Sequence, residues 1–188
     1  MPVRTFLAVD LDEAILDRMA ALQRRLDSAD SKINWVARAN LHVTMNFLGD
    51  VPDDLLPAVC DIVAAAAGPV EPFDIEIARV TVTPPRGSPR MFWAEVDDPT
   101  GRLAVLHERL DAGLEGMGLR QEKRSFKPHI TLARIKYAAN PAVLRQSAGA
   151  AADMEFGIQH VEEVVAYSSD LTGARPIYTP LSRARLGK

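Results

Sequence analysis

The sequence predicts an α+β fold in which helices pack on largely antiparallel sheets. Strand-like and helix-like segments follow one another in an irregular order, and two of the strands flank a short turn-rich loop that favours a hairpin. The 188 residues are 47% hydrophobic and 25% charged, which is ordinary globular composition and long enough to bury a core without disulfides. We therefore expect one domain over residues 1–188.

The first quarter of the chain contains three predicted strands and one helix. Residues 6–11 form an apolar run that is typical of a buried strand. Apolar residues then recur at helical spacing over 12–26, with an aspartate in position to cap the helix. Residues 33–36 begin a second extended stretch, and residues 40–48 alternate up to a turn at Gly49.

The middle of the chain contains two helices with a hairpin between them. Residues 52–67 begin with a proline and end before a glycine, as helices often do. Residues 73–83 alternate strictly between apolar and polar, and residues 91–96 return as a strand after the turn-rich loop at 84–89. Residues 100–117 place leucines along one face, which indicates an amphipathic helix.

The last third is mostly strand. Residues 129–134 and 177–186 are predicted strands, and residues 140–151 a short helix. Residues 154–168 are strand-like with a break. Low-complexity segments and obvious linkers are missing from the sequence, and the turn-rich loop at 84–89 is only a weak candidate for a domain boundary.

Charge and cysteine content limit the classes of function. The formal net charge is −3, so we do not expect a protein that coats long nucleic acids. The single cysteine, Cys60, lies in an apolar run and reads as a small buried hydrophobe more readily than as a catalytic thiol. We find neither a membrane-spanning stretch nor a signal peptide, and we expect a cytoplasmic monomer that does not contact membranes.

One segment departs from the acidic balance. Residues 120–136 contain six basic residues and one acidic residue. The basic residues are Arg120, Lys123, Arg124, Lys127, Arg134 and Lys136. This cluster indicates an anionic substrate, although a solvated basic loop is the alternative.

One short motif occurs twice. Residues 42–45 read HVTM and residues 129–132 read HITL, so each has the order histidine, apolar, threonine, apolar. With 4 histidines in the chain, chance predicts only about 0.2 histidine-x-threonine tripeptides. The repeat therefore indicates a functional pair, placed in two different strands.

The spacing has a chemical meaning. Residues i and i+2 of a strand share a face, so His42 projects with Thr44, and His129 with Thr131. Two imidazoles that titrate near neutral pH can serve as general base and general acid, and threonine hydroxyls can bind phosphate oxygens. These imidazoles and hydroxyls suit phosphodiester chemistry, whereas carbonyl hydrolysis more typically needs a serine or cysteine nucleophile.

The four histidines and two tryptophans also allow less specific interpretations. Both motif histidines could be polar residues at strand ends, and a two-histidine zinc site lacks a third ligand nearby, so we expect neither a metal nor a cofactor. We interpret His107, on the polar side of its helix, and His160 as structural. Trp35 and Trp93 are interpreted as core or pocket-wall residues.

The sequence resembles the two-histidine phosphoesterase superfamily, specifically the bacterial RNA 2′,3′-cyclic phosphodiesterases, also named 2′-5′ RNA ligases. The similar segments are RTFLAVDL at 4–11, NLHVTMNFLG at 40–49 and FKPHITLAR at 126–134. Weaker similarities lie at 89–93, 167–169 and 178–181. The formal net charge of −3 is mildly more acidic than we expect of an enzyme that acts on RNA.

The resemblance implies a bilobal fold, with two related lobes about a pseudo-twofold axis and one motif from each lobe in a central cleft. It implies metal-independent hydrolysis of 2′,3′-cyclic phosphates to 2′-phosphates, and a reverse reaction that joins RNA ends through a 2′-5′ linkage. It makes the two motif histidines the acid–base pair, without assigning the two roles, and the two threonines phosphate ligands. The expected substrate-binding residues are Thr44, Thr131, Phe47, Arg134, Phe126 and Lys127.

Phe47 and Arg134 raise a difficulty of strand geometry. Each lies five residues after a motif histidine, where the resemblance implies contacts to a nucleobase. In a regular strand, residue i+5 faces away from residue i, so a bulge, a twist or a strand end must turn these side chains. A core aromatic and a surface charge are the alternative interpretations.

Three functions are compatible with this pattern. The first is an RNA cyclic phosphodiesterase, and the second a related enzyme for another small cyclic phosphate, such as ADP-ribose 1″,2″-cyclic phosphate. The third is a non-catalytic module that binds RNA ends. The two intact motifs argue against the third, because a binding module does not need two acid–base histidines.

Overall fold

The structure is a computed structural model and describes residues 2–26, 31–119, 125–173 and 175–188. The strands in these ranges are β1 (Val3–Val9), β2 (Lys32–Trp35), β3 (Val43–Val51), β4 (Phe73–Thr83), β5 (Met91–Asp97), β6 (His129–Tyr137), β7 (Glu155–Val161), β8 (Glu163–Asp170) and β9 (Ile177–Arg185). The helices are α1 (Glu13–Leu26), α2 (Leu56–Ala67), α3 (Arg102–Leu114) and α4 (Pro141–Gly149), with 3-10 turns at Arg38–Asn40 and Asp53–Leu55. The α+β prediction is confirmed.

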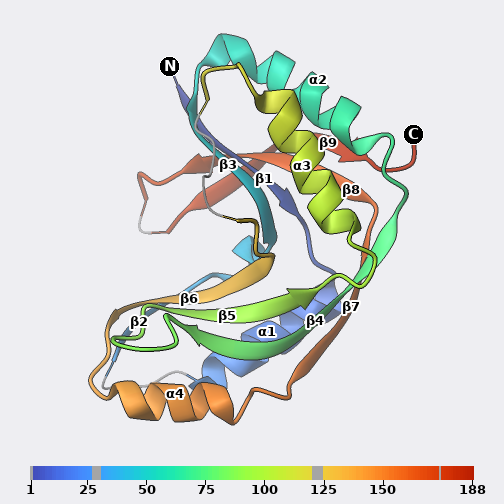
Figure 1. Cartoon of the computed structure of the whole chain (residues 1–188). Coiled ribbons are helices and arrows are strands. Elements are labelled where there is room, and N and C mark those ends of the chain that lie inside the picture. The colour runs from blue at the N-terminus through green and yellow to red at the C-terminus, as the bar shows by residue number, and fades with distance from the viewer. Residues whose placement is uncertain (1, 27–30, 120–124, 174) are drawn as a thin grey trace.

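The strands described by the structure form one curled antiparallel sheet (Figure 1). Their order is β7-β4-β5-β6-β3-β1-β8-β9, and β2 pairs with β6 beside this path. The sheet divides into two halves at its centre, where β3 meets β6 through the facing residues Val43 and Ile130. This narrow junction is the seam between two lobes, as the bilobal prediction expects.

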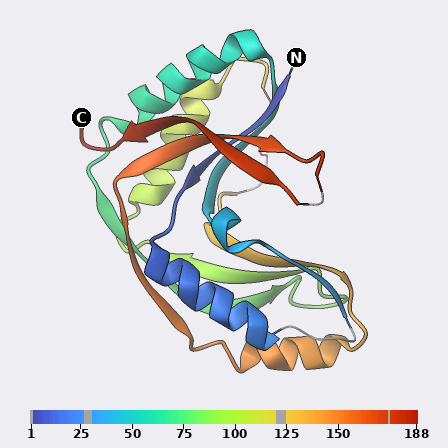
Figure 2. The ribbon, with the colours of Figure 1, turned by 180° about the vertical axis from the view of Figure 1, so that it is seen from behind.

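Each lobe is covered by its own pair of helices. Helices α2 and α3 pack on the lobe built from β1, β3, β8 and β9, and helices α1 and α4 pack on the lobe that contains β4 and β7. The view from behind shows α1 lying along the lower lobe, although it follows directly on β1 of the upper lobe (Figure 2). The chain therefore crosses between the lobes, and neither lobe is a continuous segment.

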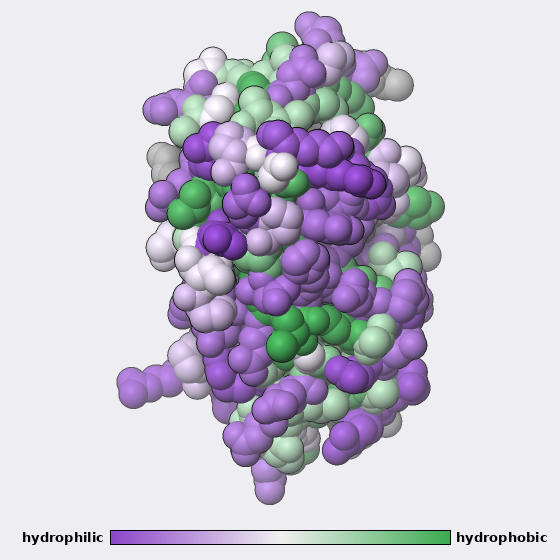
Figure 3. Space-filling model, turned by 90° about the vertical axis from the view of Figure 1, so that its right-hand side faces the viewer, coloured by the Kyte–Doolittle hydropathy of each residue, from purple (hydrophilic) through white to green (hydrophobic). Residues whose placement is uncertain are grey.

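The buried apolar side chains form one connected cluster that includes residues of both lobes. Leu7 of β1, Leu106 of α3 and Leu132 of β6, for example, are fully buried members. The outer face seen in Figure 3 is mainly hydrophilic, with a small apolar group below mid-height. Burial thus holds the lobes together from within, and polar residues cover this face.

Most predicted elements are confirmed, with one correction at a turn. The break expected within 154–168 falls at position 162, between β7 and β8, and strands β4 and β5 form the predicted hairpin. Gly49 does not end its strand. It has a φ of 73° and lies inside β3, next to an irregularity in the pairing with β1, and the strand continues to Val51.

Candidate active site

The two motifs meet at the seam of the sheet. His42 directly precedes β3 and His129 begins β6, and the apolar residues beside them, Val43 and Ile130, are the facing pair of the seam. Both apolar side chains are fully buried, whereas the histidines and threonines are half-buried. The alternation predicted from the sequence therefore places the polar residues of each motif on the opposite side from the core.

The two imidazoles are held in the same way. Nδ1 of His42 lies 2.8 Å from the carbonyl oxygen of Asn40, and Nδ1 of His129 lies 2.7 Å from the carbonyl oxygen of Lys127. A carbonyl oxygen only accepts hydrogen bonds, so each Nδ1 carries a hydrogen and donates it. Each Nε2 is then left for chemistry, and that of His42 lies 3.0 Å from Oγ1 of Thr44.

Aromatic rings fix the planes of both imidazoles. The ring of Phe6 lies 4.9 Å from that of His42, and the ring of Tyr178 meets the same imidazole edge-on at 5.6 Å. On the other side of the seam, Trp93 stacks on His129 with 3.8 Å between ring centroids. Packing of this kind limits the rotation of both imidazole rings.

Burial lowers the pKa of both motif histidines below their ordinary value, because burial disfavours the charged imidazolium. The neighbouring charges differ. The carboxylate of Asp10 acts to raise the pKa of His42, and the charge of His129 acts to lower it. The guanidinium of Arg134 lowers the pKa of His129 further. The free site therefore favours two neutral imidazoles. Of the neighbouring charges, only that of Asp10 beside His42 favours a charged imidazole.

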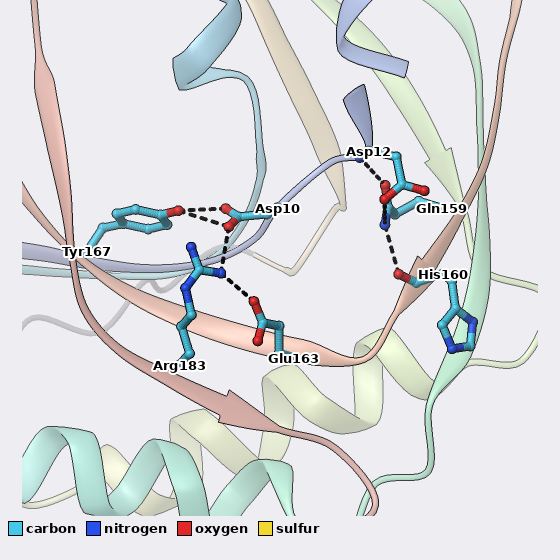
Figure 4. Close-up of polar contacts among 7 residues, drawn as sticks. All are labelled: Asp10, Asp12, Gln159, His160, Glu163, Tyr167 and Arg183. Atoms are coloured by element: carbon cyan, nitrogen blue, oxygen red, sulfur yellow. Dashed lines mark hydrogen bonds and ion pairs between the residues drawn. The ribbon is translucent and has the colours of Figure 1, made fainter. Parts of the chain in front are cut away.

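Asp10 is fixed by a network of its own (Figure 4). The hydroxyl of Tyr167 donates to both carboxylate oxygens, at 2.8 and 3.0 Å, and Arg183 donates to one of them at 3.2 Å. Arg183 also pairs with Glu163. Burial, with the carboxylate of Asp10, raises the pKa of Tyr167, so its hydroxyl remains a donor. The carboxylate that supports the charged form of His42 is thus held in one position.

Two bulges resolve the difficulty over Phe47 and Arg134. In β3 the pairing with β1 passes from Thr44 to Asn46 and skips Met45. In β6 the pairing with β5 passes from Thr131 to position 133 and skips position 132 in the same way. The residue after each motif threonine is therefore an extra one, which reverses the alternation that follows.

The reversal turns both side chains to the motif face. In β3, Met45 and Asn46 are both buried and Phe47 is 46% exposed, with its ring 6.0 Å from that of Phe6. Phe6 also contacts His42, which places Phe47 on the histidine side. Arg134 is exposed, and its charge lowers the pKa of His129 further and partly opposes the rise that burial causes in the pKa of Tyr178.

Other predicted site residues lie elsewhere or contribute differently. Phe126 is half-buried and stacks on His107 of α3 at 4.1 Å, so the structure does not bring its ring to the motif histidines. Lys127 supplies its carbonyl to His129, and its side chain is exposed. Of the basic segment, Arg120, Lys123 and Arg124 lie outside the described residues.

The other residues singled out in the sequence have structural contacts. His160 is exposed and pairs with Asp74 at 2.7 Å. Trp35 stacks on Phe92. The interpretation of Cys60 as a buried residue is wrong, because Cys60 is only half-buried on α2 and is not part of the buried core. The interpretation of His107 is wrong in one respect, because its ring does not lie on the polar side of α3 but contacts the sheet.

Sequence reasoning missed two residues that line the site, Phe6 and Tyr178. Both contact the ring of His42, one from β1 and one from β9. Burial raises the pKa of Tyr178, and the charges of Arg134 and Arg4 partly oppose this effect. The signal was present, since each lies in a segment that carries the family resemblance, but no spacing rule connects them to a histidine 36 or 136 positions away.

The described residues contain neither a cluster of metal ligands nor a membrane-spanning helix. Within these ranges, no group of three or more histidine, cysteine, aspartate or glutamate side chains is arranged to hold a metal ion. Nor is any helix in the described parts of the chain both long and apolar enough to cross a membrane.

The chain is similar in sequence to known proteins over nearly its whole length. The family model of the 2′-5′ RNA ligase superfamily matches residues 6–169. The chain is 38% identical to an RNA 2′,3′-cyclic phosphodiesterase of Methanothermobacter thermautotrophicus, over 99% of this chain and 100% of that protein. It is 32% identical to a protein of the same name from Archaeoglobus fulgidus, over 95% of this chain and 98% of that one.

Solved structures share the fold. TT0787 of Thermus thermophilus superposes with a TM-score of 0.83 at 29% identity, over 98% of both chains. LigT of E. coli in complex with 3′-AMP superposes with a TM-score of 0.79 at 25% identity, over 100% of both chains. The family match covers both motifs and most of the sheet, and the chain belongs to the 2′-5′ RNA ligase superfamily.

Proposed function

We propose that this chain hydrolyses RNA 2′,3′-cyclic phosphate ends to 2′-phosphates without a metal, using His42 and His129 as acid and base. The observation that carries the proposal is the matched pair of imidazoles at the seam, each donating from Nδ1 to a backbone carbonyl and leaving Nε2 for proton transfer. The names of the full-length relatives support the reaction.

The charges around the two histidines support an assignment of roles. The carboxylate of Asp10 favours the imidazolium of His42, and the guanidinium of Arg134 disfavours that of His129. His129 is then the base and His42 the acid. An anionic phosphodiester raises the pKa of an imidazole that it contacts, so substrate binding itself supplies the protonated partner.

The proposed reaction is an in-line displacement at phosphorus. Nε2 of His129 accepts a proton from water as the water oxygen bonds to phosphorus. The bond from phosphorus to O3′ breaks, and the hydrogen on Nε2 of His42 moves to O3′. The products are a 2′-phosphate and a 3′-hydroxyl. A 5′-hydroxyl of RNA in place of water would give a 2′-5′ linkage, which is the ligation expected from the resemblance.

The remaining site residues bind the substrate in this proposal. Thr44 and Thr131 donate hydroxyl hydrogens to the non-bridging phosphate oxygens. Phe47 and Arg134 flank the nucleobase, one from each lobe, and their turned side chains support this role. The solved complex of E. coli LigT with 3′-AMP supports a nucleotide site in this fold.

Because the site needs both lobes, residues 1–188 would act as one phosphoesterase domain. The single cysteine is consistent with work in a reducing cytoplasm.

The test is incubation with a short RNA that ends in a 2′,3′-cyclic phosphate, with EDTA present, followed by identification of the product end. We expect a 2′-phosphate, and a loss of roughly 10²- to 10⁴-fold in rate for His42→Ala and for His129→Ala. His160→Ala is the matched control, since this histidine is exposed and paired with Asp74.

The other outcomes contradict parts of the proposal. Turnover that requires a divalent ion would contradict the metal-independent chemistry. A preference for ADP-ribose 1″,2″-cyclic phosphate would replace the RNA substrate. Salt-dependent RNA binding without product would indicate a binding module.

A further inference from the structure

The carbonyl of each bulged residue is held by a polar side chain from a helix. A bulge leaves its extra residue outside the ladder of the sheet, so its backbone groups need other partners. In β3 the extra residue is Met45, and Nδ1 of His107 lies 3.0 Å from its carbonyl oxygen. In β6 it is Leu132, and Nε2 of Gln23 donates to its carbonyl oxygen at 2.9 Å.

The two side chains come from opposite lobes. His107 lies on α3 and has a side chain that is 12% exposed, while Gln23 lies on α1 and is 8% exposed. Gln23 also donates to the carbonyl of Val36, which follows β2, and the amide of Val36 donates to the same carbonyl of Leu132. In each lobe a buried side chain from a helix thus donates to the carbonyl of the bulged residue that follows the motif threonine.

His107 is itself held in place. Its Nε2 lies 3.3 Å from Oδ2 of Asp111, and the other carboxylate oxygen of Asp111 accepts a hydrogen bond from Asn46, the residue after the bulge. The flat face of the His107 ring stacks on Phe126, three residues before the second motif. Through these contacts one side chain connects the bulge of β3 with the segment that leads to His129.

We propose that His107 and Gln23 are positioning residues, each of which holds one bulge and so turns one base-binding side chain toward the motif face. His107 acts through Phe47, and Gln23 acts through Arg134. The inference rests on the proposed function, because it concerns how that site is aimed. Without His107 the carbonyl of Met45 loses this buried partner, and without Gln23 the carbonyl of Leu132 keeps only the amide of Val36. A regular strand that points Phe47 or Arg134 away then becomes competitive.

The test is a crossed set of single and double variants measured on the cyclic-phosphate RNA. His107→Phe keeps a ring to stack on Phe126 and removes the donor, and Gln23→Met keeps the length of the side chain. We expect each to lower kcat/KM by roughly 10- to 100-fold, since small misplacements near a reacting group have effects of this size. His160→Phe is the control and is expected to leave kcat/KM unchanged.

The decisive measurement is whether the positioning substitution and the substitution of the base-binding residue act independently on kcat/KM. We expect His107→Phe to lower kcat/KM by less than about threefold in a Phe47→Ala background, and by its full factor in an Arg134→Ala background. We expect Gln23→Met to lower kcat/KM by less than about threefold in the Arg134→Ala background, and by its full factor in the Phe47→Ala background. A merely structural loss would lower kcat/KM by the same factor in both backgrounds and would overturn the inference, as would a wild-type rate in either single variant.

A second variant guards against a failure to fold. His107→Gln restores an amide donor of the kind that Gln23 supplies in the other lobe, and we expect it to recover at least a third of wild-type kcat/KM. A folded His107→Gln protein as impaired as His107→Phe would contradict a role for the donor. If the wild-type chain turned over no cyclic phosphate, the proposed function would fail alone. The same single and double variants would then be compared by their Kd for adenosine 2′-monophosphate. If each substitution changed this Kd by the same factor in both backgrounds, the positioning role would be overturned.

Discussion

Replacing Thr44 with valine tests the phosphate-binding part of the site with little change in shape. The Thr44 hydroxyl lies 3.0 Å from Nε2 of His42, on a half-buried strand position where a β-branched side chain packs well. In the proposed complex this hydroxyl donates to an anionic phosphate oxygen. A hydrogen bond to a charged group contributes about 1.5–3 kcal/mol, which corresponds to about a 10- to 150-fold loss in kcat/KM.

The assay is steady-state turnover of the cyclic-phosphate RNA near pH 6.5, with Thr44→Ser as the partner variant. Serine keeps the hydroxyl, so we expect Thr44→Ser to retain most of the activity. Thermal unfolding of both variants checks that the sheet is intact. A Thr44→Val protein within threefold of wild-type kcat/KM would refute a phosphate contact at this position.

Three further predictions concern charge around the two histidines. Asp10→Asn removes the carboxylate that raises the pKa of His42, so an NMR titration of the imidazole should give a lower value than in the wild type; no change would contradict the coupling. Arg134→Ala removes a positive charge that lowers the pKa of His129, so that pKa should rise, and KM for the nucleotide substrate should rise with it. Because burial lowers both pKa values, the unfolded chain binds more protons than the folded one just below about pH 6.5. The free energy of unfolding should therefore fall as pH falls through about 6.5, and denaturant titrations that give a rise instead would contradict it.

The order of elements could be predicted because this sequence is locally consistent. The alternation at 73–83 and the leucine stripe at 100–117 correspond closely to β4 and α3. The break expected somewhere within 154–168 is present, at position 162. Gly49 was misplaced because a glycine with positive φ serves a turn and a bulge equally well, and only the neighbouring strand decides between them.

The spacing within each motif predicts which of its side chains share a face of the strand. His42 and Thr44 share a face because strand geometry requires it, and the seam that joins them to His129 is a tertiary contact that the repeat alone could only suggest. The direction of Phe47 depended on one extra residue in β3, which the alternation of side chains does not reveal. His107 was misjudged because it borders the leucine stripe, where helical position does not decide between sheet and solvent.

The most direct test of paired acid–base catalysis is the pH dependence of kcat/KM on a 2′,3′-cyclic phosphate for three proteins. For the wild type we expect a bell with its maximum below about pH 6.5, because burial lowers both pKa values in the free site. In the profile of His42→Ala, the fall of kcat/KM at alkaline pH should be missing, since no acid remains to be deprotonated. In the profile of His129→Ala, the fall at acidic pH should be missing. An unchanged bell in either variant would contradict the assignment of that histidine to the reaction.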